Sequence, residues 1–305
     1  MPLHTIPLSR RSFLAQGCVA AAGLTVVRDG WGNQPGSDPN VFALLSDTHI
    51  PGSPDVAAHG TNMTANLTQV VREVIQLTTT PAGVIINGDC AYLKGLPADY
   101  ANLARCVAPL GDAGLPLHLT MGNHDDRAPL FAALQRQQPA QSLIDSKHVA
   151  MIESPRANWF LLDSLKEVNL VTGELGAVQR EWLDKALAAR AAKPALVVVH
   201  HNPQFGPPAQ GQAWTGIQDT AELVTLLSRH KQVKALIFGH SHNWSIARHG
   251  ELHLINLPPV AYVFSAGKPN GWVQAEVLED GLALELRAID QAHKQHGEHV
   301  QLAWT

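Results

Sequence analysis

Short apolar runs alternate with helical patterns along most of the chain. Six runs have the length of buried strands, and each leads to Asp, Asn or His: residues 41–45, 83–86, 115–121, 159–162, 195–199 and 235–238. Between them, apolar residues recur at the spacing of one helix face, around Leu67, Leu103, Leu183 and Leu223. This alternation predicts an α/β fold in which helices cover sheets that lie in the middle of the molecule.

Both ends of the chain depart from this pattern. Residues 273–279 and 282–289 alternate apolar and polar positions on either side of Asp280-Gly281, which predicts an antiparallel hairpin. At the other end, Ser9-Arg10-Arg11-Ser12-Phe13-Leu14 precedes an uncharged run of small and apolar residues, as in twin-arginine export signals. This run is shorter than the roughly 20 residues that cross a bilayer, so we expect no stable membrane span.

These patterns divide the chain. We assign residues 1–35 to a twin-arginine signal peptide and linker, 36–290 to an α/β domain, and 291–305 to a polar C-terminal tail. The length allows two domains of roughly 150 residues each, but one large α/β domain is equally ordinary and is our prediction. The signal predicts a periplasmic or secreted protein that the twin-arginine export machinery carries, and the pattern specifies no oligomeric state.

The amino-acid composition excludes some classes of protein. Of 305 residues, 45% are hydrophobic and 16% charged, with a net charge of −4, which excludes a disordered chain and nucleic-acid binding by bulk charge. The 16 histidines are the unusual feature and point to metal chemistry. Cys90 and Cys106 could pair in an oxidising compartment, but neither has a C-x-x-C partner, and buried free thiols are favoured.

The residues that could carry chemistry follow the carboxyl ends of the predicted strands. In chain order, they are Asp47-x-His49, Gly88-Asp89, Gly122-Asn123-His124-Asp125, His200-His201 and Gly239-His240-x-His242. Ligands of open α/β sheets bind at this edge, because successive loops converge there. The glycines allow sharp turns and the close approach of side chains to a common centre.

The chemistry of this set favours two metal ions. Imidazoles, carboxylates and one amide oxygen, without a thiolate, suit Mn, Fe or Zn better than Ca or Mg. Seven ligands are too many for one tetrahedral site, and they are about right for two ions that share a carboxylate.

The motifs, in this order, resemble the calcineurin-like metallophosphoesterase superfamily over about 200 residues, from Asp47 to His242. The resemblance implies that residues 36–290 form a four-layer α/β/β/α sandwich of two mixed sheets. It places one metal ion on Asp47, His49 and His242, and the other on Asn123, His200 and His240. It makes Asp89 and a hydroxide the bridges and His124 the proton donor to the leaving group. A carboxylate has two oxygens to offer two cations, which agrees with a bridging Asp89.

Two positions leave alternatives open. The stretch His200-His201-Asn202-Pro203 departs from the H-H-P or H-x-P of many relatives, so either histidine could be the ligand. We assign His200, the first after the strand, and expect His201 to contact the substrate, as Asn123 also does. Asp125 and Asp126 are expected to orient the backbone or His124, and not to bind metal. The histidines and tryptophans outside the motifs are expected to be solvated or core residues.

The class of substrate is predicted from two features: the motif around Gly88-Asp89, and the resemblance to particular subgroups of the superfamily. Residues 88–94 depart from the G-D-x-V-D-R-G of protein phosphatases, which disfavours Ser/Thr protein dephosphorylation. The G-N-H-D variant in a compact chain is similar to bacterial class III cyclic-nucleotide and glycerophosphodiester phosphodiesterases, so we predict hydrolysis of a small phosphodiester. The alternative is a phosphomonoesterase of purple-acid type, since Tyr92 matches its D-x-x-Y spacing. A non-catalytic binding protein on this fold is less favoured, because a candidate for every ligand is present.

Overall fold

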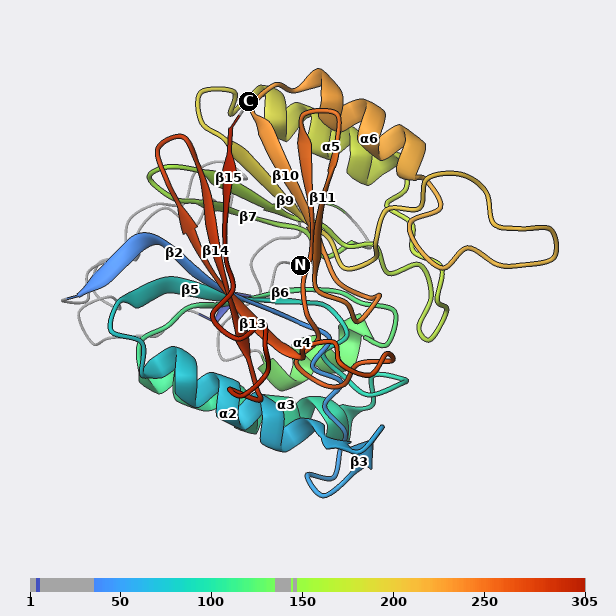
Figure 1. Ribbon diagram of the computed structural model, residues 1–305. Helices are drawn as coiled ribbons and strands as arrows, with labels where there is room; N and C mark the ends of the chain where they lie inside the picture. Colours follow the sequence, from blue (N-terminus) through green and yellow to red (C-terminus); the bar gives the residue numbers. More distant parts are fainter. Residues whose placement is uncertain (1–3, 6–35, 135–143, 145–146, 305) are drawn as a thin grey trace, which may run out of the picture.

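The computed structural model describes residues 4–5, 36–134, 144 and 147–304 (Figure 1). The twin-arginine motif at residues 9–14 lies outside the described residues. Among the helices that the structure describes, none has the length and apolar character needed to cross a bilayer.

Seven strands of the described chain form a mixed sheet in the order β1-β6-β5-β2-β13-β14-β15. Their bounds are His4–Thr5 (β1), Ser37–Ser46 (β2), Thr80–Asn87 (β5), Leu117–Thr120 (β6), Gly271–Val277 (β13), Gly281–Ala288 (β14) and His299–Ala303 (β15). Strands β2, β5 and β6 are parallel to one another, whereas β13, β14 and β15 run as antiparallel neighbours on the far side of β2. The predicted hairpin across Asp280-Gly281 is therefore confirmed as β13 and β14.

A second mixed sheet contains six strands of the described chain, in the order β11-β12-β10-β9-β8-β7. Their bounds are Ala150–Glu153 (β7), Asn158–Leu161 (β8), Ala195–Val198 (β9), Val233–Phe238 (β10), Ser245–His249 (β11) and Leu252–Asn256 (β12). Strands β8, β9, β10 and β12 are parallel, and β7 and β11 are antiparallel edge strands. A separate small hairpin pairs β3 (Ala57–Ala58) with β4 (Thr61–Asn62).

Helices cover the outer face of each sheet (Figure 1). The first sheet packs on α2 (Met63–Ile75), α3 (Pro97–Asp112) and α4 (Arg127–Leu134). The second sheet packs on α5 (Ala177–Ala188) and α6 (Thr220–Arg229). The inner faces of the two sheets pack on each other in a third apolar core. The predicted four-layer α/β/β/α sandwich is thus confirmed.

Strand β2 explains why the predicted strands are apolar at every position. Phe42 and Leu44 face the second sheet, whereas Ala43 and Leu45 face the helices, because successive side chains of a strand point to opposite faces. A strand buried on both faces has no polar alternation, as is typical of parallel strands in α/β folds.

The C-terminal segment differs from the prediction. Part of the segment assigned to a polar tail forms β15, which pairs antiparallel with β14 at the edge of the first sheet. Only Leu302 of this strand is buried, so the strand carries almost no apolar signal. His293 and His296 of the same segment hydrogen-bond with the carbonyls of Gly267 and Ala288 and so are not simply solvated.

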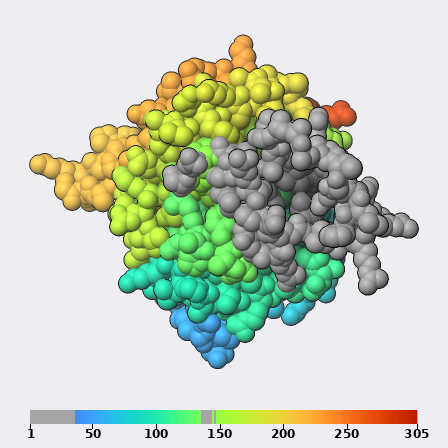
Figure 2. All heavy atoms as spheres, turned by 180° about the vertical axis from the view of Figure 1, so that it is seen from behind, coloured from blue at the N-terminus to red at the C-terminus, as the bar shows by residue number. Residues whose placement is uncertain are grey.

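The cysteines and two tryptophans behave as expected. Cys90 and Cys106 are both free and buried. Trp244 and Trp272 lie in the apolar cores, and the indole N–H of Trp272 donates to Glu73. The long connection from β9 to α6 projects from one side of the molecule in both views (Figure 1, Figure 2), and it carries Trp214 and Thr215.

Candidate metal centre

The motif residues converge where the two sheets meet. The loops after β2, β5 and β6 come from the first sheet, and those after β9 and β10 come from the second. Backbone hydrogen bonds align the first two loops, from Asp47 N–H to the Gly88 carbonyl and from His49 N–H to the Asp89 carbonyl. The His240 N–H donates to the Asp47 carboxylate across the sheets at 3.1 Å. Both sheets therefore supply one site.

Metal-binding atoms gather there in overlapping groups whose members lie within 4.8 Å of one another. The groups are Asp47, His49 and His242; Asp47, Asp89 and His200; His49, Asp89 and His124; and His200, His201 and His240. Asp89 Oδ2 lies 3.6 Å from His49 Nε2 and 3.4 Å from His200 Nε2, so this carboxylate stands between the two predicted metal positions. That is the place a shared ligand would occupy.

Hydrogen bonds orient the imidazoles. Nδ1 of His242 and Nδ1 of His200 lie 2.6 Å and 2.9 Å from the carbonyls of Tyr262 and Asn87. His240 instead turns Nε2 to the Thr215 carbonyl, at 2.8 Å. A carbonyl only accepts, so the proton of each neutral ring resides on the nitrogen that faces it. The opposite nitrogen of each ring then carries a lone pair that is available to a metal ion.

Several of these atoms have no hydrogen-bond partner in the part of the chain that the structure describes. Asn123 Oδ1 and His200 Nε2 are buried and without a hydrogen bond among the described residues. Nε2 of His49 and Nε2 of His242 face each other at 3.0 Å. Burial lowers the pKa of His49 to about 3, so its ring is neutral. Unpartnered buried acceptors beside two carboxylates fit a pair of cations.

The electrostatics of Asp89 and His200 favour positive charge at the same point. Burial opposes a charge on His200, but Asp89 and Asp47 outweigh it and raise the pKa of His200 to about 9. Burial likewise opposes the charge on Asp89, yet His200 holds the pKa of this carboxyl well below its usual range. The two carboxylates near Nε2 thus favour positive charge at His200, whether a proton or a bound cation supplies it.

The backbone at the site is strained. Eight non-glycine residues of the described chain have positive φ, and five of them are predicted metal ligands: Asp47, His49, Asp89, His240 and His242. Such conformations cost of order 1–3 kcal/mol each and persist only where the surroundings impose them. The remaining three are His59, Leu93 and Asn169, and the last of these donates its N–H to the Asn123 carbonyl. The fold therefore imposes strain chiefly where side chains must meet at the centre.

The motif glycines permit this crowding. A Cβ at Gly122 would overlap the backbone and carboxylate of Asp89, and one at Gly239 would overlap Ser46 and the Asp47 carboxylate. A Cβ at Gly88 would meet His200 Nδ1 at 2.5 Å. The expectation that these glycines allow close approach is confirmed.

Asp125 holds the second and third motif loops together. Its carboxylate accepts hydrogen bonds from the N–H groups of Cys90, Ala91 and Gly122 at 3.0–3.1 Å, and from the Tyr100 hydroxyl. Burial raises the pKa of Asp125 to about 6, with a further contribution from the charge of Asp89. The prediction that Asp125 orients the backbone is confirmed.

His124 is half-buried at the edge of the cluster. Its Nδ1 lies 2.6 Å from the carbonyl of Leu93, which fixes the ring and leaves Nε2 for another partner. Its backbone N–H, and not its ring, donates to Asp89 at 2.9 Å. The ring centroid lies 5.3 Å from that of His49, so the imidazole borders the first metal position.

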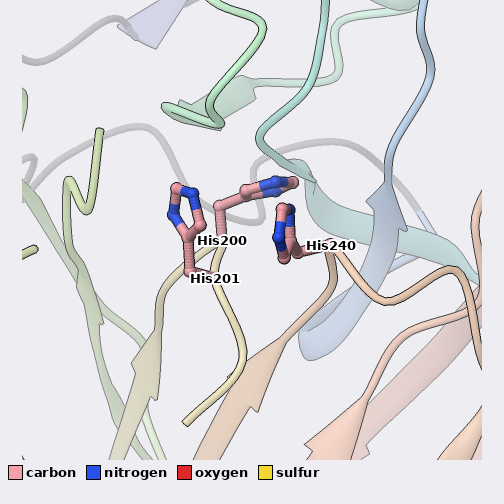
Figure 3. A group of neighbouring side chains, drawn as sticks. All are labelled: His200, His201 and His240. Atoms are coloured by element: carbon pink, nitrogen blue, oxygen red, sulfur yellow. The ribbon is translucent and has the colours of Figure 1, made fainter. Parts of the chain in front are cut away.

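His200 and His201 follow β9 directly, and their rings diverge (Figure 3). The ring of His201 lies 4.6 Å from that of His240, and its Nε2 is buried without a hydrogen bond to the described residues. Nδ1 of His201 meets the hydroxyl of Ser164 at 2.7 Å, which either donates or accepts. The tautomer of His200 is therefore fixed by a carbonyl, whereas that of His201 is adjustable.

The profile of calcineurin-like phosphoesterases matches residues 41–244, which contain every predicted ligand. This chain belongs to the calcineurin-like phosphoesterase family. It is a metal-dependent phosphoester hydrolase, because the family's activity and the grouped metal-binding side chains agree.

Characterised phosphoesterases resemble the chain over most of its length. It is 25% identical over 237 residues to a 3′,5′-cyclic-nucleotide phosphodiesterase of Nostoc, which covers 75% of this chain and 81% of that protein. It is 32% identical over 204 residues to a cAMP/cGMP dual specificity phosphodiesterase of Mycobacterium tuberculosis, covering 66% of this chain and 61% of the relative. A dimetal phosphatase from Danio rerio has the same fold, with a TM-score of 0.67, 16% identity, and coverage of 88% of this chain and all of that one.

Some aromatic residues at the site of this phosphoesterase were not predicted from its sequence. Tyr262 and Phe264 lie against the predicted ligand His242, at ring-centroid distances of 5.0 Å and 4.4 Å. They occupy a loop after β12 that carries no metal-binding motif, so sequence patterns gave no signal for them. Tyr92 is half-buried against the core beneath the first sheet, and a ligand role for it stays a prediction.

Proposed function

We propose that this chain hydrolyses small phosphodiesters, of the cyclic-nucleotide or glycerophosphodiester type, with two ions drawn from Mn, Fe or Zn. The observation that supports it most is the position of Asp89 between two groups of imidazole and carboxylate ligands. The names of the Nostoc and Mycobacterium tuberculosis relatives support the diester substrate. Such an ion pair lowers the pKa of water and neutralises charge that develops on the phosphoryl group.

In this proposal, the protein's own groups position the substrate and move the proton. Asp47, His49 and His242 hold one ion, while Asn123, His200 and His240 hold the other, with Asp89 shared. In its doubly protonated form, His124 gives the proton on Nε2 to the departing alkoxide and becomes a neutral ring, while its Nδ1–H stays bound to the Leu93 carbonyl and holds the imidazole in place. His201 offers an N–H at Nε2 to a phosphoryl oxygen when the Ser164 hydroxyl donates to its Nδ1.

The test compares bis(p-nitrophenyl) phosphate with p-nitrophenyl phosphate as substrates of the protein reconstituted with Mn. We expect a higher kcat/KM for the diester, and no measurable hydrolysis by the Asn123→Ala variant. In the same series, His201→Gln is expected to raise KM while the metal content stays that of the wild type. A preference for the monoester would overturn the diesterase and favour the purple-acid alternative, for which a visible absorption band from Fe(III) and Tyr92 is the marker. Inactivity toward both substrates would contradict the enzyme's proposed substrate class.

The N-terminal motif supports a proposed location. We infer that the twin-arginine machinery exports the protein to the periplasm or medium, because the paired Arg10 and Arg11 precede Phe13, Leu14 and an apolar run. Replacing both arginines with lysine is expected to keep the protein in the cytoplasm, as measured by fractionation of the host cells. Export of this variant at the wild-type level would contradict the inference.

A further inference from the structure

A continuous series of aromatic contacts leads outward from the metal centre. The ring of Tyr262 stacks on the ligand His49 at 5.3 Å, with an angle of 23° between the planes. Phe264 stacks on the ligand His242 at 4.4 Å and 27°. His59 contacts both, at 4.4 Å from Tyr262 and 5.6 Å from Phe264. We call Tyr262, Phe264 and His59 the aromatic rim.

The rim is firmly held. Ala261 N–H donates to the Asp47 carbonyl at 3.0 Å, next to Tyr262, and the Asn66 side chain donates to the carbonyls of Val260 and Ala261. His59 and Gly60 form the two-residue turn between β3 and β4, both with positive φ, as in the tight turns that match the twist of a hairpin. Both sides of the rim therefore have a fixed position relative to the metal ligands.

The rim also presents an aromatic face to the solvent. Phe264 remains 63% exposed, whereas Tyr262 is only 7% exposed. The Phe264 ring stacks on His242, and its contacts with His59 and Tyr262 are both T-shaped, at 88° and 68°, so these three rings leave much of the side chain open to solvent. An exposed ring that stacks on a metal ligand is placed to contact whatever the metal centre binds, unlike an isolated apolar residue on the surface.

The rim and the proposed proton donor contact the same predicted ligand. The ring of His49 lies 5.3 Å from that of Tyr262 and 5.3 Å from that of His124, between centroids. Leu93, whose carbonyl orients His124, adds an exposed apolar side chain next to that histidine. The rim is therefore one ring away from the group that we propose protonates the leaving oxygen.

We propose that the aromatic rim, with Phe264 as its exposed member, binds the planar base of a nucleoside phosphodiester by stacking. This inference rests on the proposed phosphodiesterase function and names its substrate class: cyclic nucleotides are preferred over glycerophosphodiesters, which lack a planar base. Stacking of a base on an aromatic side chain is worth about 1–3 kcal/mol, so loss of the Phe264 ring should weaken binding about tenfold.

The test measures KM and kcat with 3′,5′-cAMP and with glycerophosphoglycerol for the wild type, Phe264→Ala, Phe264→Leu and Phe264→Trp. We expect Ala and Leu to raise KM for cAMP about tenfold, Trp to restore it, and kcat to change less than about twofold. Glycerophosphoglycerol has neither a planar base nor a cationic group that an aromatic ring would attract, so its constants should stay at the wild-type values in all three variants. Phe205→Ala is the matched control, because Phe205 is 53% exposed and stacks on His249, which is not a ligand, at 4.6 Å.

Metal content and the comparison of substrates distinguish loss of base stacking from a disturbance of the metal centre. Metal content, measured by mass spectrometry, should equal that of the wild type in each Phe264 variant, since the ring contacts His242 but does not orient it. Equal losses with cAMP and glycerophosphoglycerol, or a Leu variant as good as Phe, would overturn the base-stacking inference. Failure of the wild type to hydrolyse either diester would instead count against the proposed function itself.

Discussion

Replacing Asp89 with Asn is expected to reduce the metal content of both positions and to lower kcat by more than about 10²-fold. Removing a group that merely orients a ligand costs about 10- to 100-fold in affinity or activity, and Asp89 is a candidate ligand itself. The amide keeps the size of the side chain but loses the negative charge that attracts cations to Nε2 of His49 and His200, 3.6 Å and 3.4 Å away. Metal analysis of the purified variant, together with diesterase kinetics, measures both effects.

Asp126→Asn is the matched control for this experiment. Asp126 lies on the same loop as His124, but its carboxylate accepts a hydrogen bond from the Ala128 N–H, and Asn accepts the same bond. We expect wild-type metal content and kinetics for this control. If the Asp89→Asn protein retains two ions, the bridging assignment is wrong.

Replacing His124 with Ala is expected to lower kcat by about 10²–10⁴-fold for a diester with an alkyl leaving group, the usual contribution of a positioned acid. Metal content should be unchanged, because the hydrogen bond of His124 to Asp89 comes from its backbone N–H, which Ala retains, and the resemblance assigns the ring no metal. The loss should be smaller for bis(p-nitrophenyl) phosphate, since p-nitrophenolate departs with little need of a proton.

The comparison of the two leaving groups is the informative measurement for His124. If His124 is a general acid, the ratio of wild-type kcat to variant kcat should depend on the leaving group. If it is a metal ligand, kcat should fall by a similar factor on both substrates, and metal should be lost as well. Depletion of metal in the His124→Ala protein would show that this residue binds an ion and does not donate the proton.

Much of the fold could be predicted from sequence because the central strands are buried on both faces. Strand β5 has seven buried residues after Thr80, and its apolar run leads directly to Asp89. Helix α2 buries Leu67, Val70, Val71 and Val74, the residues whose helical spacing predicted it, and also Met63 at its start. Where the inward-facing residues of an element are fully buried, the spacing of its apolar residues is enough to predict whether it is a helix or a strand.

Edge elements escaped prediction for the opposite reason. Strand β11 exposes every residue except the half-buried Ile246, and α4 buries only Leu130 and Leu134. These elements depend on contacts with the rest of the fold and not on their own pattern.

The metal site, too, could be predicted only in part. The strand-end motifs predicted which side chains would meet, because their positions follow from the topology of parallel strands. The order of His200 and His201 in the sequence could not say which backbone or hydroxyl group each ring would meet. That information comes from Asn87 and Ser164, which lie 113 and 37 residues away in the chain.

The strand order has a consequence for biosynthesis. Strand β2, which ends next to Asp47 and His49, pairs on one side with β5 and on the other with β13, Gly271–Val277. The middle of the first sheet is therefore finished only by residues synthesised after the entire second sheet. A nascent chain that has not yet reached β13 would hold all seven predicted ligands without the strand that braces the first two. We therefore expect stable metal binding only after β13 has been synthesised and has paired with β2.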